Sequence, residues 1–254
     1  MFLPGTIYNP PVTQLQGKVA LITGGAKHLG RAIGLAMAQA GAEIFFTFNS
    51  SDQEAAKTVE EINQIGHGAT ACRCDVRNSQ DVTSTLAKIT EQSGKIDLLV
   101  NNAGFYEDVL FPDVTEEQWD NMFAINVRGP FLVSKHAVPA LRAAKGKIIN
   151  IGSLGGEKPW ATHAHYCASK AALHMLTKVM AKSLAPDVAV NCVAPGMLSY
   201  DQSDPAMNKR FADMTPMKRI GTAQDVVSTV MYLSTAPHFL TGQVVVVDGG
   251  LGLR

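Results

Sequence analysis

The sequence is poor in cysteine, shows no excess of charge of either sign and contains no long apolar run. Its four cysteines, Cys72, Cys74, Cys167 and Cys192, lack paired Cys-x-x-Cys spacing, so we expect neither a metal site nor a disulfide framework, but reduced and buried thiols. Basic and acidic residues number 22 each, which leaves a formal net charge of zero. A nucleic-acid or anionic-membrane partner therefore has no electrostatic support, and no segment approaches membrane-spanning length.

The first 16 residues differ in composition from the rest of the chain. They lack the apolar core of a signal peptide and carry Pro4, Pro10 and Pro11, so we expect a loose N-terminal arm over residues 1–16 and a cytoplasmic protein. Residues 17–254 suffice for one domain with a full core, because 46% of the chain is hydrophobic and 17% is charged. No repeat or low-complexity tract indicates a second domain.

Apolar, strand-like runs alternate with amphipathic segments along this domain. Strands are expected near residues 18–23, 43–48, 69–74, 96–101, 147–152, 188–193 and 243–247, with helices between most of them. The alternation predicts an α/β fold of the Rossmann type, in which helices cover both faces of a doubly wound, parallel, seven-stranded sheet. Ligands of such folds gather at the carboxyl ends of the strands.

The first predicted strand breaks into a glycine-containing turn that precedes a helical pattern. In this order of elements, backbone N–H groups at the helix N-terminus face a pyrophosphate, and glycine allows the close approach. The spacing departs from Gly-x-Gly-x-x-Gly, and taken alone it also fits a purely structural turn. The candidate phosphate-binding residues are Gly24, Lys27, His28, Leu29 and Gly30.

Tyr166 and Lys170 stand four residues apart, within a helix expected over residues 164–184. One helical turn places the Lys170 ammonium beside the Tyr166 phenol, and an adjacent cation lowers a phenol pKa from its ordinary value of about 10. Such a tyrosine exchanges a proton at neutral pH, and Ser153 upstream supplies an orienting hydroxyl. Because an isolated Tyr-x-x-x-Lys also arises by chance, the other segments decide between these interpretations.

Taken together, the ordered landmarks resemble those of the short-chain dehydrogenase/reductase family in its single-domain form, from Gln16 to the end of the chain. They are Thr23-Gly24-x-x-x-His28-x-Gly30, Asp75-Val76, Asn101-Asn102-Ala103-Gly104, Asn126, Ser153, Tyr166-x-x-x-Lys170, Pro195-Gly196 and Asp248-Gly249-Gly250. The resemblance implies a single dinucleotide-binding catalytic domain over residues 17–254. It also implies cofactor contacts from Asp75, Val76, Asn102, Ala103, Gly104, Tyr166, Lys170, Pro195, Gly196 and Leu198.

The chemistry that this resemblance implies is hydride transfer between nicotinamide C4 and a carbonyl carbon. Tyr166 would give the carbonyl oxygen its proton, Ser153 would hydrogen-bond the same oxygen, and Lys170 would hold the nicotinamide ribose. Asn126 would anchor a water of the proton relay, or it would be a helix-interior asparagine bonded to backbone. Ser153 likewise has a structural alternative as the cap of a turn.

The segment after the second predicted strand favours NADP(H) as the cofactor. Phe48 occupies the position where an NAD enzyme usually has an acid, so no carboxylate there would repel a 2′-phosphate. Neutral donors follow at Asn49, Ser50 and Ser51, and basic side chains of the glycine turn add charge-assisted contacts. Asp52 lies beyond the usual position, and we expect it to cap the next helix rather than bind ribose.

The identity of the substrate is less constrained. Pteridine reductases also have a basic residue at the position of His28, but they typically carry an aspartate where this chain has Ser153. The serine favours the carbonyl reductases, and a 3-oxoacyl-thioester-like substrate is our first expectation. A pteridine or quinone reductase and an alcohol dehydrogenase of the same family are alternatives, and a non-catalytic NADPH-binding sensor is an alternative of another class.

The segments expected to face this small-molecule carbonyl or alcohol substrate are rich in aromatic and apolar residues. They carry Phe105, Tyr106, Trp160, His163, Met197, Tyr200 and Met207, although each of these would equally suit a core or a subunit interface. Residues 197–215 look like a substrate lid whose short helix opens at Asp201, Ser203 and Asp204. Helices near 116–143 and 163–184 have apolar residues beyond one face, which favours a homo-oligomer, and the family resemblance favours a tetramer.

Overall fold

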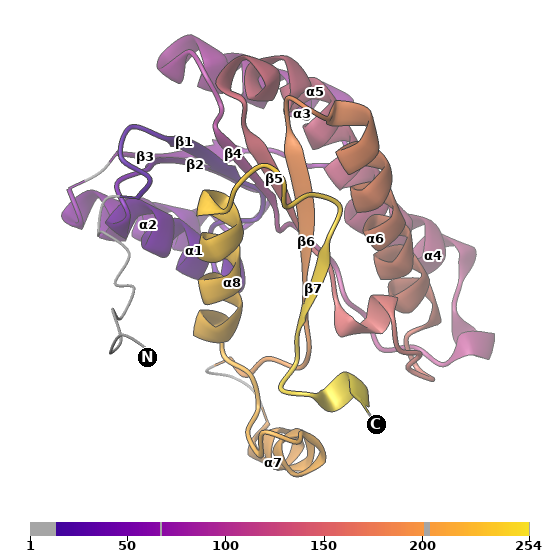
Figure 1. Cartoon of the computed structure of the whole chain (residues 1–254). Coiled ribbons are helices and arrows are strands. Elements are labelled where there is room, and N and C mark those ends of the chain that lie inside the picture. Colours follow the sequence, from indigo (N-terminus) through magenta and orange to yellow (C-terminus); the bar gives the residue numbers. More distant parts are fainter. Residues whose placement is uncertain (1–13, 67, 201–203, 254) are drawn as a thin grey trace, which may run out of the picture.

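One sheet organises the molecule, and its strands follow the predicted runs closely (Figure 1). Within residues 14–66, 68–200 and 204–253, which the computed structural model describes, seven parallel strands lie in the order β3-β2-β1-β4-β5-β6-β7. They are β1 (Val19–Ile22), β2 (Glu43–Phe48), β3 (Ala69–Arg73), β4 (Leu98–Asn101), β5 (Lys147–Ile151), β6 (Ala189–Pro195) and β7 (Val244–Val247). The predicted Rossmann-type fold is confirmed. The strand order reverses between β1 and β4.

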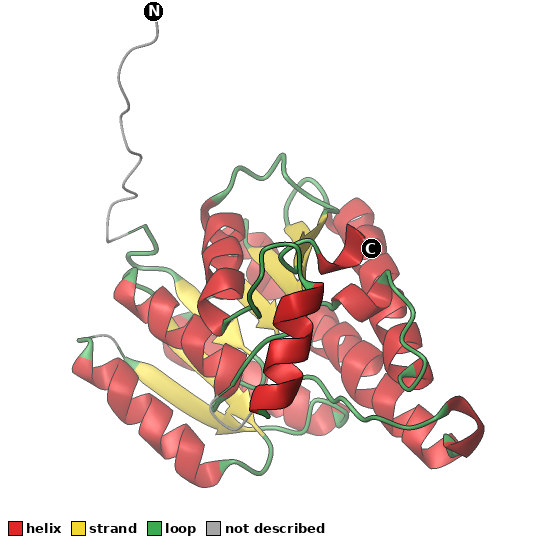
Figure 2. Cartoon of the chain, turned by 90° about the horizontal axis from the view of Figure 1, so that it is seen from below, coloured by secondary structure: helices red, strands yellow, loops and turns green. Residues whose placement is uncertain are grey.

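Helices form a layer on each face of this sheet (Figures 1 and 2). They are α1 (His28–Gln39), α2 (Asp52–Gln64), α3 (Ser79–Ser93), α4 (Glu116–Phe123), α5 (Gly129–Ala144), α6 (Ala164–Leu184), α7 (Pro205–Met214) and α8 (Ala223–Thr235). Helices α1, α2 and α8 cover one face, whereas α3, α4, α5 and α6 cover the other. Helix α7 lies apart from both layers, beyond the carboxyl end of β6.

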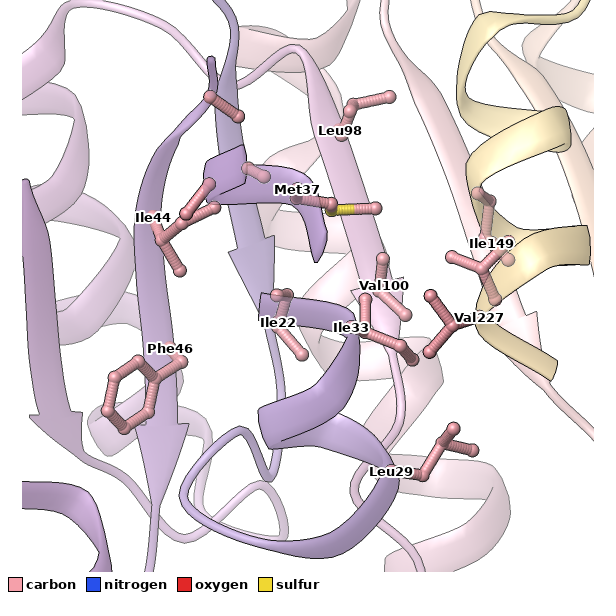
Figure 3. Packing of buried hydrophobic residues seen from close by; sticks show 14 of the residues in the cluster. Ile22, Leu29, Ile33, Met37, Ile44, Phe46, Leu98, Val100, Ile149 and Val227 are labelled. Atoms are coloured by element: carbon pink, nitrogen blue, oxygen red, sulfur yellow. The ribbon is translucent and has the colours of Figure 1, made fainter. Parts of the chain in front are cut away.

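The strands read as continuous apolar runs because both of their faces are buried. Ala20 and Ile22 of β1 belong to the core cluster beneath α1 and α8, and Val19 and Leu21 belong to the cluster on the opposite face. Figure 3 shows the first cluster, where Ile22 and its neighbours meet Ile33 of α1. A strand in this position needs apolar side chains at every residue, so it shows no alternation of apolar and polar residues.

The long helix predicted near residues 116–143 is divided, which corrects that expectation. Helix α4 ends at Phe123, a π-helical turn follows over Ala124–Arg128, and α5 begins at Gly129. Pro130 has no N–H group to donate to the carbonyl of Asn126, so the regular helical ladder cannot continue through this point. The interruption falls where Asn126 faces the loop that follows β4, and π-helical turns are frequent at functional sites.

The packed part of the chain begins earlier than predicted. Leu15 is buried in the core, and its N–H group donates to the carbonyl of Ala40 over 2.9 Å. The expectation of a loose arm over residues 1–16 is therefore wrong at Leu15, and residues 1–13 lie outside the described part. The predicted lid residues Asp201 and Ser203 also lie outside it, whereas Asp204 caps α7 by accepting from the N–H of Ala206.

All four cysteines are free, and three of them, Cys72, Cys74 and Cys192, are buried as predicted, while Cys167 is half-buried. Across the described ranges, no group of three or more His, Cys, Asp or Glu side chains is placed to hold a metal ion. None of the helices within those ranges has both the length and the apolar character needed to cross a membrane.

A buried carboxylate ties β1 to the start of β4. Asp97 accepts hydrogen bonds from Lys18 Nζ at 2.8 Å and from the Val19 N–H at 2.9 Å, and Lys95 Nζ lies 3.1 Å away. Burial disfavours the charged carboxylate, but the bonds from Lys18, Val19 and Lys95 outweigh it and hold the pKa of Asp97 below its usual range. The ionised form therefore stabilises the fold.

We predict that Asp97→Asn lowers the free energy of unfolding by about 2 kcal/mol near neutral pH, because the buried N–H and two ammonium groups lose a charged partner. The lowered pKa makes this contribution present above the unfolded-state value of about 3.9 and lost as the pH falls through the lower folded-state value, so the difference between wild type and variant should shrink between neutral pH and about pH 3. Urea unfolding at both pH values measures the difference. Asp187→Asn, which breaks an exposed pair with Arg142, is the control, and an equal loss by Asp97→Asn at both pH values would contradict the prediction.

Candidate functional site

A cleft of about 1030 Å³ opens at the carboxyl ends of the strands, where the strand order reverses between β1 and β4. Its wall brings together nearly every residue that the sequence predicted for the site. These are Gly24, Lys27, His28, Leu29, Gly30, Asn49, Ser50, Ser51, Asp75, Val76, Asn102, Ala103, Gly104, Ser153, Tyr166, Lys170, Pro195, Gly196 and Leu198. Asn126 is the predicted residue that does not line the cleft.

The glycine turn after β1 is fastened to the end of β4 by one amide side chain. Asn102 Nδ2 donates to the carbonyl oxygens of Thr23 at 3.0 Å and Gly24 at 2.9 Å. A Cβ atom on Gly30 would collide with the Gly24 carbonyl and the Asn102 amide, and Gly24 has a φ of +65°. Glycine at both positions thus lets the turn pack tightly while the N-terminus of α1 opens on the cleft, and this cradle fits a dinucleotide pyrophosphate.

His28 keeps an unfavourable backbone conformation in this turn. Its φ is +51°, in the left-handed region that costs a non-glycine residue about 1 kcal/mol or more. Lys27 and His28 are both exposed at the cleft, and the His28 ring lies 4.8 Å from the ring of Tyr200 across it.

The end of β2 carries a basic neighbour that sequence reasoning missed. Arg73 of β3 pairs in register with Phe48, and its guanidinium lies 5.6 Å from the centre of the Phe48 ring. It donates to the Asn49 carbonyl at 3.1 Å and forms an ion pair with Asp52. The cap of α2 is Ser51, so the predicted capping role of Asp52 is wrong by one residue. Strand register, which places Arg73 beside Phe48, was the signal that could have revealed it.

Asp75 follows β3 and lines the cleft, where it forms an ion pair with Arg77. The Arg77 side chain donates to both carboxylate oxygens of Asp75, and the hydrogen bonds with Arg77 hold the pKa of Asp75 below its usual range. Arg77 also donates to Asn121 Oδ1 at 2.8 Å. Arg77 and Asn121 both line the cleft, and neither was predicted from the sequence. Val76 packs against Gly129, where an added Cβ would come within 2.9 Å of its Cγ2.

Ser153, Tyr166 and Lys170 meet at the cleft wall, as their order in the sequence predicted. Ser153 follows β5, and its hydroxyl accepts from the Gly155 N–H at 3.0 Å and also forms a hydrogen bond with the Tyr166 phenol. The serine therefore caps a turn and contacts Tyr166 at the same time. Lys170 Nζ donates to the Ile151 carbonyl at 2.9 Å and lies 5.8 Å from the centre of the Tyr166 ring.

The pKa of Tyr166 corrects one expectation. Burial raises the pKa of its phenol to about 12, against a smaller lowering by the hydrogen bond with Ser153. The Lys170 ammonium does not offset this effect of burial, because it donates to the Ile151 carbonyl and is itself buried, which reduces the Lys170 pKa to about 8. The phenol is consequently protonated at neutral pH, which suits a proton donor.

Asn126 sits behind the loop that follows β4. Its Oδ1 accepts from the Phe105 N–H at 2.8 Å, and its Nδ2 donates to the Phe105 carbonyl at 2.9 Å and to Ser169 Oγ at 3.0 Å. The fully buried Asn126 side chain thus hydrogen-bonds to backbone, which was the structural role considered for it from the sequence. Its bond to Ser169 also joins this loop to α6, one residue before Lys170. Its role in a proton relay stays a prediction.

Aromatic rings surround the Tyr166 phenol. The Tyr106 ring meets the Tyr166 ring edge-on at 5.3 Å, and the Trp160 ring lies nearly parallel to it at 6.4 Å. His163 Nε2 hydrogen-bonds the Tyr106 hydroxyl at 2.6 Å, although His163 itself is buried behind the wall. The other predicted substrate-facing residues, Phe105, Met197, Tyr200 and Met207, line the same cleft.

Known proteins resemble this chain over almost its whole length. The family model described as "Enoyl-(Acyl carrier protein) reductase" matches residues 24–252. A 3-oxoacyl-[acyl-carrier-protein] reductase of Staphylococcus aureus is 34% identical over 240 residues, which cover 92% of this chain and 98% of the relative. A short-chain dehydrogenase/reductase of a Cladobotryum species is 33% identical over 256 residues, covering 96% of this chain and 98% of the relative.

Solved structures agree with these relatives. A gluconate 5-dehydrogenase of Burkholderia cenocepacia, solved in complex with NADP and tartrate, superimposes with a TM-score of 0.89 at 30% identity. The match covers 96% of this chain and 98% of that structure. This chain therefore belongs to the short-chain dehydrogenase/reductase family and is an oxidoreductase acting on CH–OH and C=O groups.

Proposed function

We propose that the protein is an NADPH-dependent carbonyl reductase and that its favoured substrate is a 3-oxoacyl thioester. The observation that carries this proposal is the hydrogen-bonded pair of Ser153 and Tyr166 hydroxyls on the cleft wall, with the buried Lys170 ammonium behind them. The 3-oxoacyl-[acyl-carrier-protein] reductase of Staphylococcus aureus, similar over 98% of its own length, supports the choice of substrate.

The proposed mechanism assigns one task to each of these side chains, while NADPH, when bound, supplies the hydride. The Tyr166 hydroxyl gives its proton to the carbonyl oxygen as negative charge develops there, and Ser153 donates a second hydrogen bond to that oxygen. The raised pKa of Tyr166 keeps the proton in place until the reaction needs it. Lys170 then stabilises the phenolate electrostatically from its position beside the ring.

The preference for NADP(H) is proposed on the charges around the cleft. Among the described residues that line it, Asp75 is the one carboxylate, and Arg77 already neutralises that group. Lys27 and His28 offer basic side chains at the glycine turn, and Phe48 leaves the end of β2 without an acid. The solved relative in complex with NADP is consistent with this choice.

Alcohol oxidation by the same residues is the second candidate function, because the gluconate 5-dehydrogenase is so similar in structure. Tyr166 would then act as the base, but its high pKa keeps the phenolate scarce at neutral pH, whereas the protonated form that reduction needs is already present. Reduction is thus favoured. Pteridine or quinone reduction has no feature of its own in the described residues, and the complete Ser153, Tyr166 and Lys170 set disfavours a non-catalytic sensor.

We further propose that the protein is cytoplasmic and forms a homo-oligomer, the tetramer that the family resemblance favours. Helix α6 leaves Met175 59% exposed and Val179 52% exposed, and Phe131 of α5 is 44% exposed. Apolar side chains on neighbouring helices suit a contact with a second copy of the chain. The lid over residues 197–215 stays a prediction, although Met207 of α7 does reach the cleft wall.

We predict that Tyr166→Phe lowers kcat for ketone reduction by at least about a hundredfold, because the ring stays while the proton donor is lost. NADPH affinity should change little, and a fluorescence titration of NADPH measures it separately. Ser153→Ala is the companion variant and should cost less, since Tyr166 can still donate its proton. Wild-type turnover in Tyr166→Phe would remove Tyr166 from the mechanism.

The buried lysine predicts a pH profile for reduction. The lowered pKa of Lys170 means that its ammonium is present below about pH 8 and is lost as the pH rises through that value. The Tyr166 phenol, with a pKa of about 12, keeps its proton over the same range. Initial rates at constant ionic strength should therefore show kcat/KM falling above about pH 8. A profile that stays level well into the alkaline range would show that the Lys170 charge is not needed.

A further inference from the structure

Arg73 stands at the outer rim of the cleft, where the ends of β2 and β3 lie side by side. Its guanidinium lies over the Phe48 ring, donates to the Asn49 carbonyl and pairs with Asp52, the first residue of α2. The Arg73 and Asp52 side chains are 61% and 59% exposed, so both groups face solvent at the rim. One arginine thus contacts three successive parts of the β2–α2 connection.

The position of Asp52 gives this contact its significance. Asn49, Ser50 and Ser51 line the cleft, and Asp52 follows directly in the chain. A bare carboxylate there would stand close to the place proposed for a 2′-phosphate, and charges of the same sign at that range repel one another. Arg73 cancels the carboxylate charge, so the pair as a whole leaves no net negative charge at the rim.

We propose that Arg73 is a specificity-determining residue that makes the β2–α2 connection accept NADPH in preference to NADH. It does so by holding the Asn49 backbone and by neutralising Asp52, and the proposal rests on the NADP(H) preference in the proposed function. Its position on β3, outside the glycine turn and the end of β2, adds a third element to cofactor selection.

The chemistry of arginine suits this task better than that of lysine. A planar guanidinium donates in several directions at once, so it can serve the Asn49 carbonyl and the Asp52 carboxylate together while its face rests on an aromatic ring. Phe48 therefore has a second use besides leaving out an acid, because its ring supports the guanidinium. A lysine at this position would keep the positive charge but could not donate in these fixed directions to the Asn49 carbonyl and the Asp52 carboxylate together.

The test compares the binding of NADP⁺ and NAD⁺ by calorimetry, with kcat/KM for NADPH and NADH as a second readout. Arg73→Met should reduce the preference for NADP⁺ about tenfold, because an unpaired Asp52 then faces the phosphate, while NAD⁺ affinity stays within about twofold. Arg73→Lys should fall between Arg73→Met and wild type. Added salt should shrink the effect, since the interaction lies in solvent.

A second variant separates charge from simple damage. Adding Asp52→Asn to Arg73→Met should recover much of the preference for NADP⁺, because the exposed carboxylate is gone. A merely structural role for Arg73 predicts no such recovery. Arg142→Met is the matched control, since Arg142 also pairs with a half-exposed aspartate, Asp187, but lies outside the cleft wall, and it should leave the preference unchanged.

The outcomes separate this inference from the proposed function. If wild type prefers NADP⁺ and Arg73→Met keeps the full preference, the inference about Arg73 is overturned and the reductase proposal stands. If Arg73→Met loses the preference but Asp52→Asn does not restore any of it, the charge argument is overturned. If wild type binds NAD⁺ as tightly as NADP⁺, both the inference and the cofactor half of the proposed function fail.

Discussion

The attachment of α6 to the carboxyl end of the sheet is the constraint on which the site depends. Lys170 donates to the carbonyl of Ile151 at the end of β5, and about two turns further along α6, Thr177 accepts from Asn150 at 2.8 Å. Ser169, the residue before Lys170, accepts from Asn126 at 3.0 Å. These buried polar contacts cannot be given up without leaving unpaired groups, so they fix the rotation of α6 and with it the place of Tyr166.

Burial then sets the proton chemistry of the site in both directions. The same low-dielectric surroundings raise the pKa of the Tyr166 phenol and lower that of the Lys170 ammonium, because each group is pushed towards its neutral form. Tyrosine therefore holds its proton at neutral pH, and the charge of the lysine responds to pH near 8. The cofactor selection that we propose depends on different groups, the solvent-exposed charges of Arg73 and Asp52 beside the end of β2.

The sequence predicted those features that local pattern determines. Strands buried on both faces appear in the sequence as continuous apolar runs. The glycine turn after β1 is recognisable because the packing around Gly30 leaves no room for a side chain. Contacts between distant segments were harder to foresee. The Arg73 contact needs the register of β3 against β2, and the pKa of Tyr166 needs its burial, which spacing from Lys170 does not reveal. The break before α5 has a local signal in Pro130, which lacks the N–H group that a continuous helix would need at this position.

The most direct test of the central claim is the rate at which the wild-type protein consumes NADPH with an acetoacetyl thioester, followed by the absorbance of the reduced nicotinamide. Parallel reactions with NADH, and with a dihydropterin, a quinone and a diketone, define the substrate class. The account predicts fast, stoichiometric oxidation of NADPH with the thioester and slower oxidation of NADH. Tight NADPH binding without turnover of any of these carbonyl compounds would contradict it.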